Sequence, residues 1–80
     1  MFYTYVLYSK SFNKIYIGFT SNIKGRITAH NHPSNKGWTK SFMPWEILFY
    51  ETFNTKTEAT NREKELKTSQ GRNYIRSKIL

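Results

Sequence analysis

The sequence contains no cysteine and no aspartate. Without cysteine, the 80-residue chain can form neither a disulfide nor a thiolate metal site, as is usual for intracellular proteins. Its only side-chain carboxylates are five glutamates, and the first of them is Glu46. Because a site for two metal ions usually draws on several carboxylate ligands, we do not expect a multi-carboxylate metal cluster.

Long apolar runs are also missing. No segment approaches the ~20 apolar residues that cross a bilayer, and the N-terminus lacks the apolar stretch of a signal peptide. We therefore expect a cytoplasmic protein that does not associate with membranes. The length predicts a single domain over residues 1–80 with one modest core, since a domain of this size buries only about 60–65% of its unfolded surface.

Positive charge dominates what is present. Thirteen lysines and arginines face five acids, which gives a formal net charge of +8, and no acid precedes Glu46. A surface of this kind is typical of proteins that bind polyanions, most often nucleic acid. We expect nucleic acid as the partner; a generic basic protein is the alternative.

Alternating β-branched and aromatic residues predict three strands, Phe2–Tyr8, Lys14–Phe19 and Trp45–Phe53. The polar loop 9–13 is expected to join the first two strands as a hairpin. An antiparallel register with an odd residue sum would place Tyr5 and Tyr16 on the same sheet face, and an even sum would separate them. In the third strand we expect one face to carry Trp45, Ile47, Phe49 and Phe53, and the other Glu46, Leu48 and Tyr50.

The second strand has two unusual residues for its position. Tyr16 brings a hydroxyl that needs a partner, and Gly18 leaves out a side chain where a strand normally packs one. We interpret Gly18 as room for the close approach of a phosphate backbone, with Tyr16 beside it. Ordinary structural roles for both residues are the alternative.

A first helix is expected from a cap at 20–22 to about Asn31, with Ile23 and Ile27 facing the sheet. Arg26 and His30 lie one turn apart on a neighbouring face. They suggest a phosphate clamp and a proton carrier; a solvated helix edge is the alternative.

The following loop, 31–44, mixes Lys36, Trp38 and Lys40, which could contact a nucleic-acid backbone or base. A plain connection is equally consistent with this composition.

A second helix is expected from a capping box, Thr55 with Glu58, to about Thr68. Ala59 and Leu66 mark its inner face, and Glu63 falls between them. A carboxylate there is costly unless it binds a metal or pairs with a cation. The candidate partners for an ion pair are Arg26, Arg62 and Lys67.

The sequence 69–71 is expected to break the chain before a last short helix, Arg72–Leu80. The predicted fold class is therefore α/β, a three-stranded antiparallel sheet flanked by helices in the order β-β-α-β-α-α. Arg72 is a further candidate for nucleic-acid binding.

This order of elements and residues resembles the GIY-YIG nuclease superfamily over nearly the whole chain, especially its small stand-alone members. Those members are similar to the catalytic domain of the incision subunit of bacterial excinuclease. The second motif is intact as Tyr16-Ile17-Gly18, and the first stands as Tyr3-Thr4-Tyr5. Arg26, His30 and Glu63 match the positions of the family's arginine, its tyrosine or histidine, and its metal-binding glutamate.

The resemblance implies an endonuclease that depends on Mg²⁺ or Mn²⁺ and hydrolyses DNA, in repair or processing. Glu63 would anchor a hydrated ion, and Arg26 would hold the scissile phosphate. Tyr5 or Tyr16 would orient and deprotonate water, or His30 would take the proton. Gly18, Lys36, Lys40 and Arg72 complete the expected nucleic-acid-binding set.

Two positions depart from the family pattern. Some members have lysine immediately after the second motif, where this chain has Phe19, and some have a late asparagine for which Asn73 is the candidate. A non-catalytic nucleic-acid-binding module on the same fold is therefore the first alternative, and a basic protein-interaction domain is the second. RNA stays an alternative substrate, and a protein partner or a dimer is expected to supply specificity.

Overall fold

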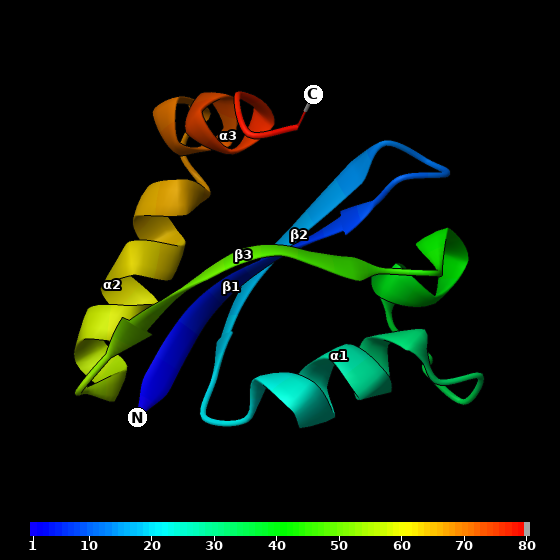
Figure 1. The fold of residues 1–80 in the computed structure, drawn as a ribbon, viewed down its shortest axis with the longest axis horizontal. Helices are drawn as coiled ribbons and strands as arrows, with labels where there is room; N and C mark the ends of the chain where they lie inside the picture. Colours follow the sequence, from blue (N-terminus) through cyan, green and yellow to red (C-terminus); the bar gives the residue numbers. More distant parts are fainter. Residues whose placement is uncertain (80) are drawn as a thin grey trace.

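The computed structural model describes residues 1–79 and contains one three-stranded sheet (Figure 1). Its strands are β1 (Phe2–Ser9), β2 (Lys14–Thr20) and β3 (Glu46–Phe53), arranged in the order β2-β1-β3 with both pairings antiparallel. The central strand β1 has fully buried side chains on both faces, Tyr5 and Leu7 on one and Val6 on the other. The predicted fold class is confirmed.

Helices cover both faces of the sheet. The first, α1 (Ile23–Asn31), lies on one side, and α2 (Lys56–Leu66) with α3 (Ser69–Arg76) lies on the other (Figure 1). On the α1 side, Ile27 packs against a buried cluster of Tyr5, Leu7 and Trp45. The cluster on the opposite side consists of Val6, Ile15, Ile17, Leu66 and Ile75. None of the helices in the described part of the chain has both the length and the apolarity needed to span a bilayer.

The predicted loop 31–44 contains a short 3-10 helix, η1 (Trp38–Phe42), that the sequence did not reveal. Side-chain hydrogen bonds hold this segment in place. The amide of Asn31 donates to the carbonyl oxygen of Trp45 at 2.8 Å and accepts from its backbone N–H at 2.6 Å. The indole of Trp45 donates to the carbonyl oxygen of Thr39 at 2.8 Å. The loop is therefore an ordered wall beside α1.

The predicted last helix is wrong at both ends. Residues 69–71 form the first turn of α3, because the Thr68 hydroxyl accepts a hydrogen bond from the backbone N–H of Gly71 and caps the helix. A Cβ added at Gly71 would clash with the backbone of Glu65 and Leu66, so glycine allows α3 to cross α2 closely. The helix ends at Arg76, and Leu80 lies outside the described residues.

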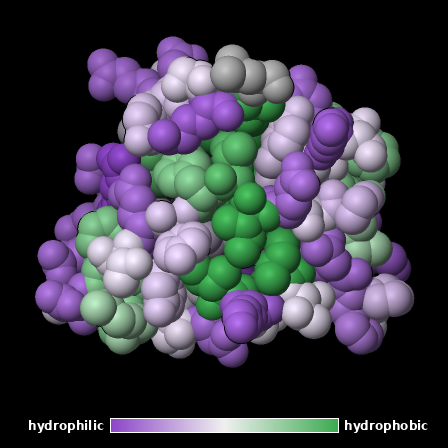
Figure 2. Space-filling model, in the orientation of Figure 1, coloured by the Kyte–Doolittle hydropathy of each residue, from purple (hydrophilic) through white to green (hydrophobic). Residues whose placement is uncertain are grey.

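The predicted faces of β3 are also wrong beyond its midpoint. Val6 pairs with Phe49 while Leu7 pairs with Ile47, so Leu48 is an extra residue in a bulge. Ile47 and Phe49 consequently face opposite sides of the sheet, and both Leu48 and Phe49 pack on the α2 side. Figure 2 shows hydrophobic residues across the middle of this view, over β3, surrounded by hydrophilic ones.

Candidate active site

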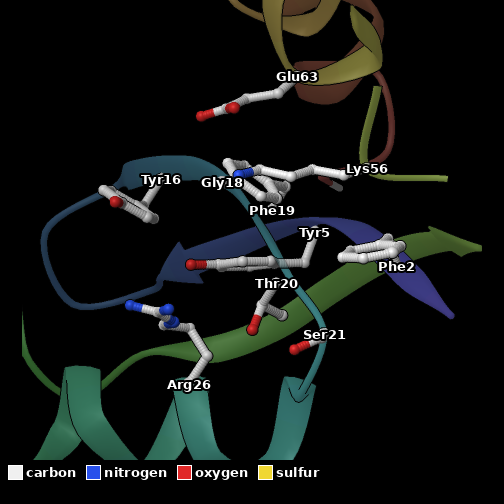
Figure 3. Close-up of a pocket in the computed structure, with 10 residues that line it drawn as sticks. All are labelled: Phe2, Tyr5, Tyr16, Gly18, Phe19, Thr20, Ser21, Arg26, Lys56 and Glu63. Carbon is white, nitrogen blue, oxygen red and sulfur yellow. The ribbon is translucent and has the colours of Figure 1, made fainter. Parts of the chain in front are cut away.

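A hollow of about 390 Å³ opens beside the edge strand β2 (Figure 3). We call it the β2 hollow. It brings together five of the residues singled out from the sequence and one that was not. They are Tyr5, Tyr16, Gly18, Arg26 and Glu63, with Lys56 as the addition.

The strand register answers the question about the two tyrosines. Tyr5 pairs with Gly18 and Leu7 pairs with Tyr16, so the residue sum is odd and both phenols project from the same sheet face. Their ring centroids lie 6.2 Å apart. The central strand and the edge strand thus deliver both side chains to the β2 hollow.

Gly18 has a different purpose from the one expected. A Cβ added there would lie 2.7 Å from the hydroxyl oxygen of Tyr5 and 2.8 Å from its Cζ atom. The space above Gly18 is therefore occupied by the phenol of Tyr5 and is not a gap for a phosphate. Glycine at this position lets the Tyr5 ring lie flat across β2 with its hydroxyl in the hollow.

Gly18→Ala is expected to lower the free energy of unfolding by about 1–3 kcal/mol, because the added methyl overpacks a buried contact. Urea denaturation followed by circular dichroism measures this. Gly37→Ala is the matched control, since its nearest contact would be 3.4 Å from the Asn35 side-chain oxygen. In a Tyr5→Ala background the Gly18→Ala cost should largely disappear; an undiminished cost would show that Tyr5 is not the obstacle.

His30 is held against Tyr5 by a chain of hydrogen bonds. Its Nε2 lies 3.2 Å from the Tyr5 hydroxyl, and its Nδ1 lies 3.0 Å from the Thr39 hydroxyl. The side-chain amide of Asn35 donates to Thr39 Oγ1 at 2.7 Å and to the His30 carbonyl oxygen at 2.9 Å. Because a hydroxyl can donate or accept, Thr39 satisfies either neutral tautomer of His30. No pattern in the sequence indicated these roles of Thr39 and Asn35.

The surroundings keep Tyr5 protonated. Burial is the largest cause that raises the pKa of Tyr5, and the neighbouring Tyr16 and Glu63 add to it, while Arg26 opposes them. The raised pKa means that the phenol holds its proton at neutral pH and acts as a hydrogen-bond donor or acceptor. Tyr16 is only half-buried and stays the phenol that is open to the hollow.

Burial, and then the charge of Arg26, lower the pKa of His30 below its ordinary value of 6.5. The folded protein therefore binds a proton at this site less readily than the unfolded chain does. The contribution of His30 to the free energy of unfolding is therefore constant above about pH 6.5. Below that pH the contribution decreases, and the protein becomes less stable.

Urea titrations between pH 8 and pH 5 measure this dependence. His30→Gln should flatten the decline between pH 7 and pH 5, whereas His32→Gln, at the exposed end of α1, should leave the profile unchanged. A profile of the His30→Gln protein that superimposes on the wild-type profile would contradict the assignment.

Glu63 reaches the hollow from the other side of the sheet. Figure 3 shows it approaching β2 from α2, with Arg26 approaching from α1. We expected the site residues to meet on one face of the sheet. Arg26 and Glu63 instead approach from opposite faces and meet around the edge of β2. The Glu63 side chain is 18% exposed, and one of its oxygens, Oε2, lies 2.9 Å from the Lys67 ammonium. The ion pair between Glu63 and Lys67, the alternative to metal binding, thus exists, and it joins a residue that lines the β2 hollow to one that lies outside it.

The donor set fits a hydrated magnesium or manganese ion. Residues 1–79 contain no cluster of three or more histidine, cysteine, aspartate or glutamate side chains that could hold a metal alone. Mg²⁺ commonly keeps several waters and binds through one or two carboxylates together with substrate phosphates. A single carboxylate at the rim of an open hollow meets that requirement, provided that the ion displaces the ammonium of Lys67.

Lys56 was missed by the sequence reasoning. It is the first residue of α2, and its ammonium lies 5.8 Å from the centre of the Phe19 ring. Figure 3 shows its amine beside Gly18, between Glu63 and Tyr5. No ion pair involves Lys56 among the residues that the structure describes. One sequence feature pointed to it. Some family members have a lysine directly after the second motif, and because this chain has Phe19 there, a lysine from elsewhere in the chain was needed to supply that charge.

The remaining candidates lie around the β2 hollow. Lys36 and Lys40 are exposed on the wall formed by loop 31–44 and do not line the hollow. Arg72 lines a separate depression with Tyr16 and Lys67. Asn73 is exposed in α3 and does not line the β2 hollow, so the structure does not bring it to Glu63.

The chain is similar to known proteins in sequence and in fold. Residues 1–76 match the GIY-YIG catalytic domain family. A UPF0213 protein of Staphylococcus haemolyticus is 38% identical over 82% of this chain and 79% of its own length. Another, of Clostridium perfringens, is 36% identical over the whole chain and 88% of its own length. The solution structure of a UPF0213 protein from Bacillus halodurans has 26% identity and a TM-score of 0.56, covering 96% of this chain and 84% of that one.

Proposed function

The chain belongs to the GIY-YIG catalytic domain family, and from this and the β2 hollow we propose that it is a divalent-metal-dependent endonuclease that hydrolyses DNA phosphodiester bonds. The observation that carries the proposal is the meeting of a guanidinium, two phenols and a carboxylate around one hollow of about 390 Å³. A nucleic-acid substrate follows from the family. DNA as the substrate, repair or processing as the context and an intracellular location are the finer parts of the proposal.

Cations bind and orient the substrate. Arg26 projects from α1 and presents a fork of N–H donors that matches two phosphate oxygens. Lys56 lies across the hollow and contacts a further oxygen of the same or the next phosphate. Together they hold the scissile group and offset the charge that develops on it in the transition state.

Glu63 would hold the metal ion, Mg²⁺ or Mn²⁺, which would supply stabilisation of charge on the leaving oxygen. Lys67 pairs with this carboxylate in the structure. Lys67 also lines the depression that contains Arg72, where both cations can contact the substrate backbone.

The phenols and His30 handle the attacking water. We assign its orientation to Tyr5, whose hydroxyl is fixed by His30 at 3.2 Å. His30, neutral at pH 7 because its pKa is lowered, accepts the proton: the Tyr5 hydroxyl takes it from the water and passes its own proton to Nε2 of His30. Tyr16, which lines the hollow with Tyr5, helps to position the water.

Incubation of the protein with duplex, nicked, branched and single-stranded DNA tests the function. We expect strand scission in the presence of Mg²⁺ or Mn²⁺ and none with EDTA. A complete lack of scission over the panel, with binding retained, would favour the second candidate, a non-catalytic nucleic-acid-binding module. The observation that favours that candidate is the ion pair between Lys67 and Glu63, because it engages the carboxylate that would bind the metal.

Lys36, Lys40 and Arg72 are proposed to extend the contact with the nucleic-acid backbone outside the hollow. A chain of this size has little surface for reading a base sequence, because specific interfaces bury about 1,000 Å² or more of protein. We therefore propose that specificity comes from a protein partner, a dimer or the shape of the substrate.

A further inference from the structure

Trp38 is an exposed aromatic ring that the structure holds in place. It is the first residue of η1, and 55% of its surface is open to solvent. Its ring centroid lies 4.8 Å from that of Phe42 and 5.9 Å from that of Trp45, which is itself buried. The indole is therefore supported from within by two aromatic rings, while a large part of it faces outward.

The position of Trp38 connects it with the proposed active site. It lines a hollow of about 360 Å³ together with Tyr16, Arg26 and His30. It also lines the depression of about 280 Å³ that contains Tyr16, Lys67 and Arg72. Tyr16 belongs to both and to the β2 hollow as well, so the three hollows adjoin at its side chain, and together we call them the groove.

The charged side chains that line the two hollows bordered by Trp38 are all cations. Arg26 lies in one of them, and Lys67 and Arg72 lie in the other, with Lys67 paired to Glu63 of the β2 hollow. Within residues 1–79, no carboxylate lines either of the two hollows that contain Trp38. A flat aromatic ring between cations complements a strand that alternates planar bases with phosphates.

We propose that Trp38 stacks an unpaired base of the substrate strand, one or two nucleotides from the phosphate held by Arg26. This inference rests on the proposed function for the position of that phosphate. The substrate class is thereby narrowed to single-stranded or locally unpaired nucleic acid. The bases of an intact duplex are stacked on one another and cannot offer a face to a ring in the side wall of a groove.

The test measures binding without cleavage. Labelled single-stranded DNA, single-stranded RNA and a blunt DNA duplex are titrated with the protein in EDTA, and fluorescence anisotropy gives each Kd. Trp38→Ala should raise the Kd for the single strand by about 5- to 150-fold, since base stacking on an aromatic ring is worth about 1–3 kcal/mol. Its Kd for the duplex should change less than about twofold, and Trp38→Phe should be intermediate.

Tyr50→Ala is the matched control, because Tyr50 is similarly exposed at 53% but lies on β3 away from the groove. A second measurement does not depend on the fold of a variant: the single strand should quench the indole fluorescence of the wild-type protein, and Trp38→Phe should remove most of that quenching. The DNA and RNA titrations distinguish the two sources of an unpaired base.

Equal weakening of single-strand and duplex binding by Trp38→Ala, or no weakening of either, would overturn the inference. Binding of a protein partner by Trp38 in place of a base would give the second of these results. EDTA removes the divalent ion, so these titrations measure binding alone. The stacking inference can therefore fail while the proposed nuclease activity holds, and the activity can fail while the stacking inference holds.

Discussion

Glu63→Gln is expected to reduce the rate of metal-dependent strand scission by about 100- to 1,000-fold. The substitution keeps the size of the side chain but removes the one carboxylate that, among residues 1–79, lines the β2 hollow. Loss of a metal contribution of several kcal/mol to the transition state corresponds to a decrease of this size. Single-turnover cleavage at saturating Mg²⁺ or Mn²⁺ measures the rate.

The control for Glu63 lies on the same helix. Glu65 is exposed, and within residues 1–79 its one ion-pair contact is to Arg62 at 3.6 Å, outside the β2 hollow. Glu65→Gln should therefore cleave at nearly the wild-type rate, because an exposed pair of this kind contributes little to stability. Equal rates for the Glu63→Gln protein and the wild type would remove the metal-binding role from Glu63.

Arg26→Ala is expected to lower the cleavage rate by about 100- to 1,000-fold as well, for a different reason. The guanidinium supplies donors to the phosphate as negative charge develops, and removal of one such preorganised group costs about 2.7–4 kcal/mol in comparable sites. Arg26 is exposed at the surface of α1, so its loss should leave the melting temperature almost unchanged.

Two further variants define the role of Arg26. Arg26→Lys keeps the charge but loses the planar fork, and should recover only part of the rate. Lys24→Ala removes a cation from the same helix outside the β2 hollow and should have little effect. A cleavage rate that depends on the number of positive charges in α1, and not on Arg26 itself, would show that the phosphate is held elsewhere.

The elements of this fold that could be predicted from the sequence are those set by local interactions. Asn22 caps α1 as expected, with its side-chain oxygen accepting from the backbone N–H of Gly25 at 3.1 Å. Thr55 caps α2, and its hydroxyl accepts from the backbone N–H of Glu58 at 3.2 Å. The structure also explains why a glycine, which weakens a helix, stands at position 25 in α1. A Cβ there would lie 2.7 Å from the side-chain amide nitrogen of the capping residue Asn22.

Features that depend on contacts across the fold escaped the sequence. The bulge at Leu48 shifts the second half of β3 because of its pairing with β1, which no local pattern encodes. The packing of Tyr5 over Gly18 and the contact of the Lys56 ammonium with the Phe19 ring of β2 likewise depend on residues far apart in the sequence. The family motifs singled out the candidate site residues that line the β2 hollow without these contacts, but they did not predict that Glu63 approaches around the edge of β2.

The central claim is that the β2 hollow binds the divalent ion through Glu63, and manganese-induced line broadening tests it most directly. Substoichiometric Mn²⁺ is added to ¹⁵N-labelled protein, and the amide signals that broaden are mapped on the structure. We predict selective broadening around Glu63, Gly18 and Tyr16, which is lost in Glu63→Gln and retained in Glu65→Gln. Broadening centred on another part of the chain, or unchanged by Glu63→Gln, would contradict the account.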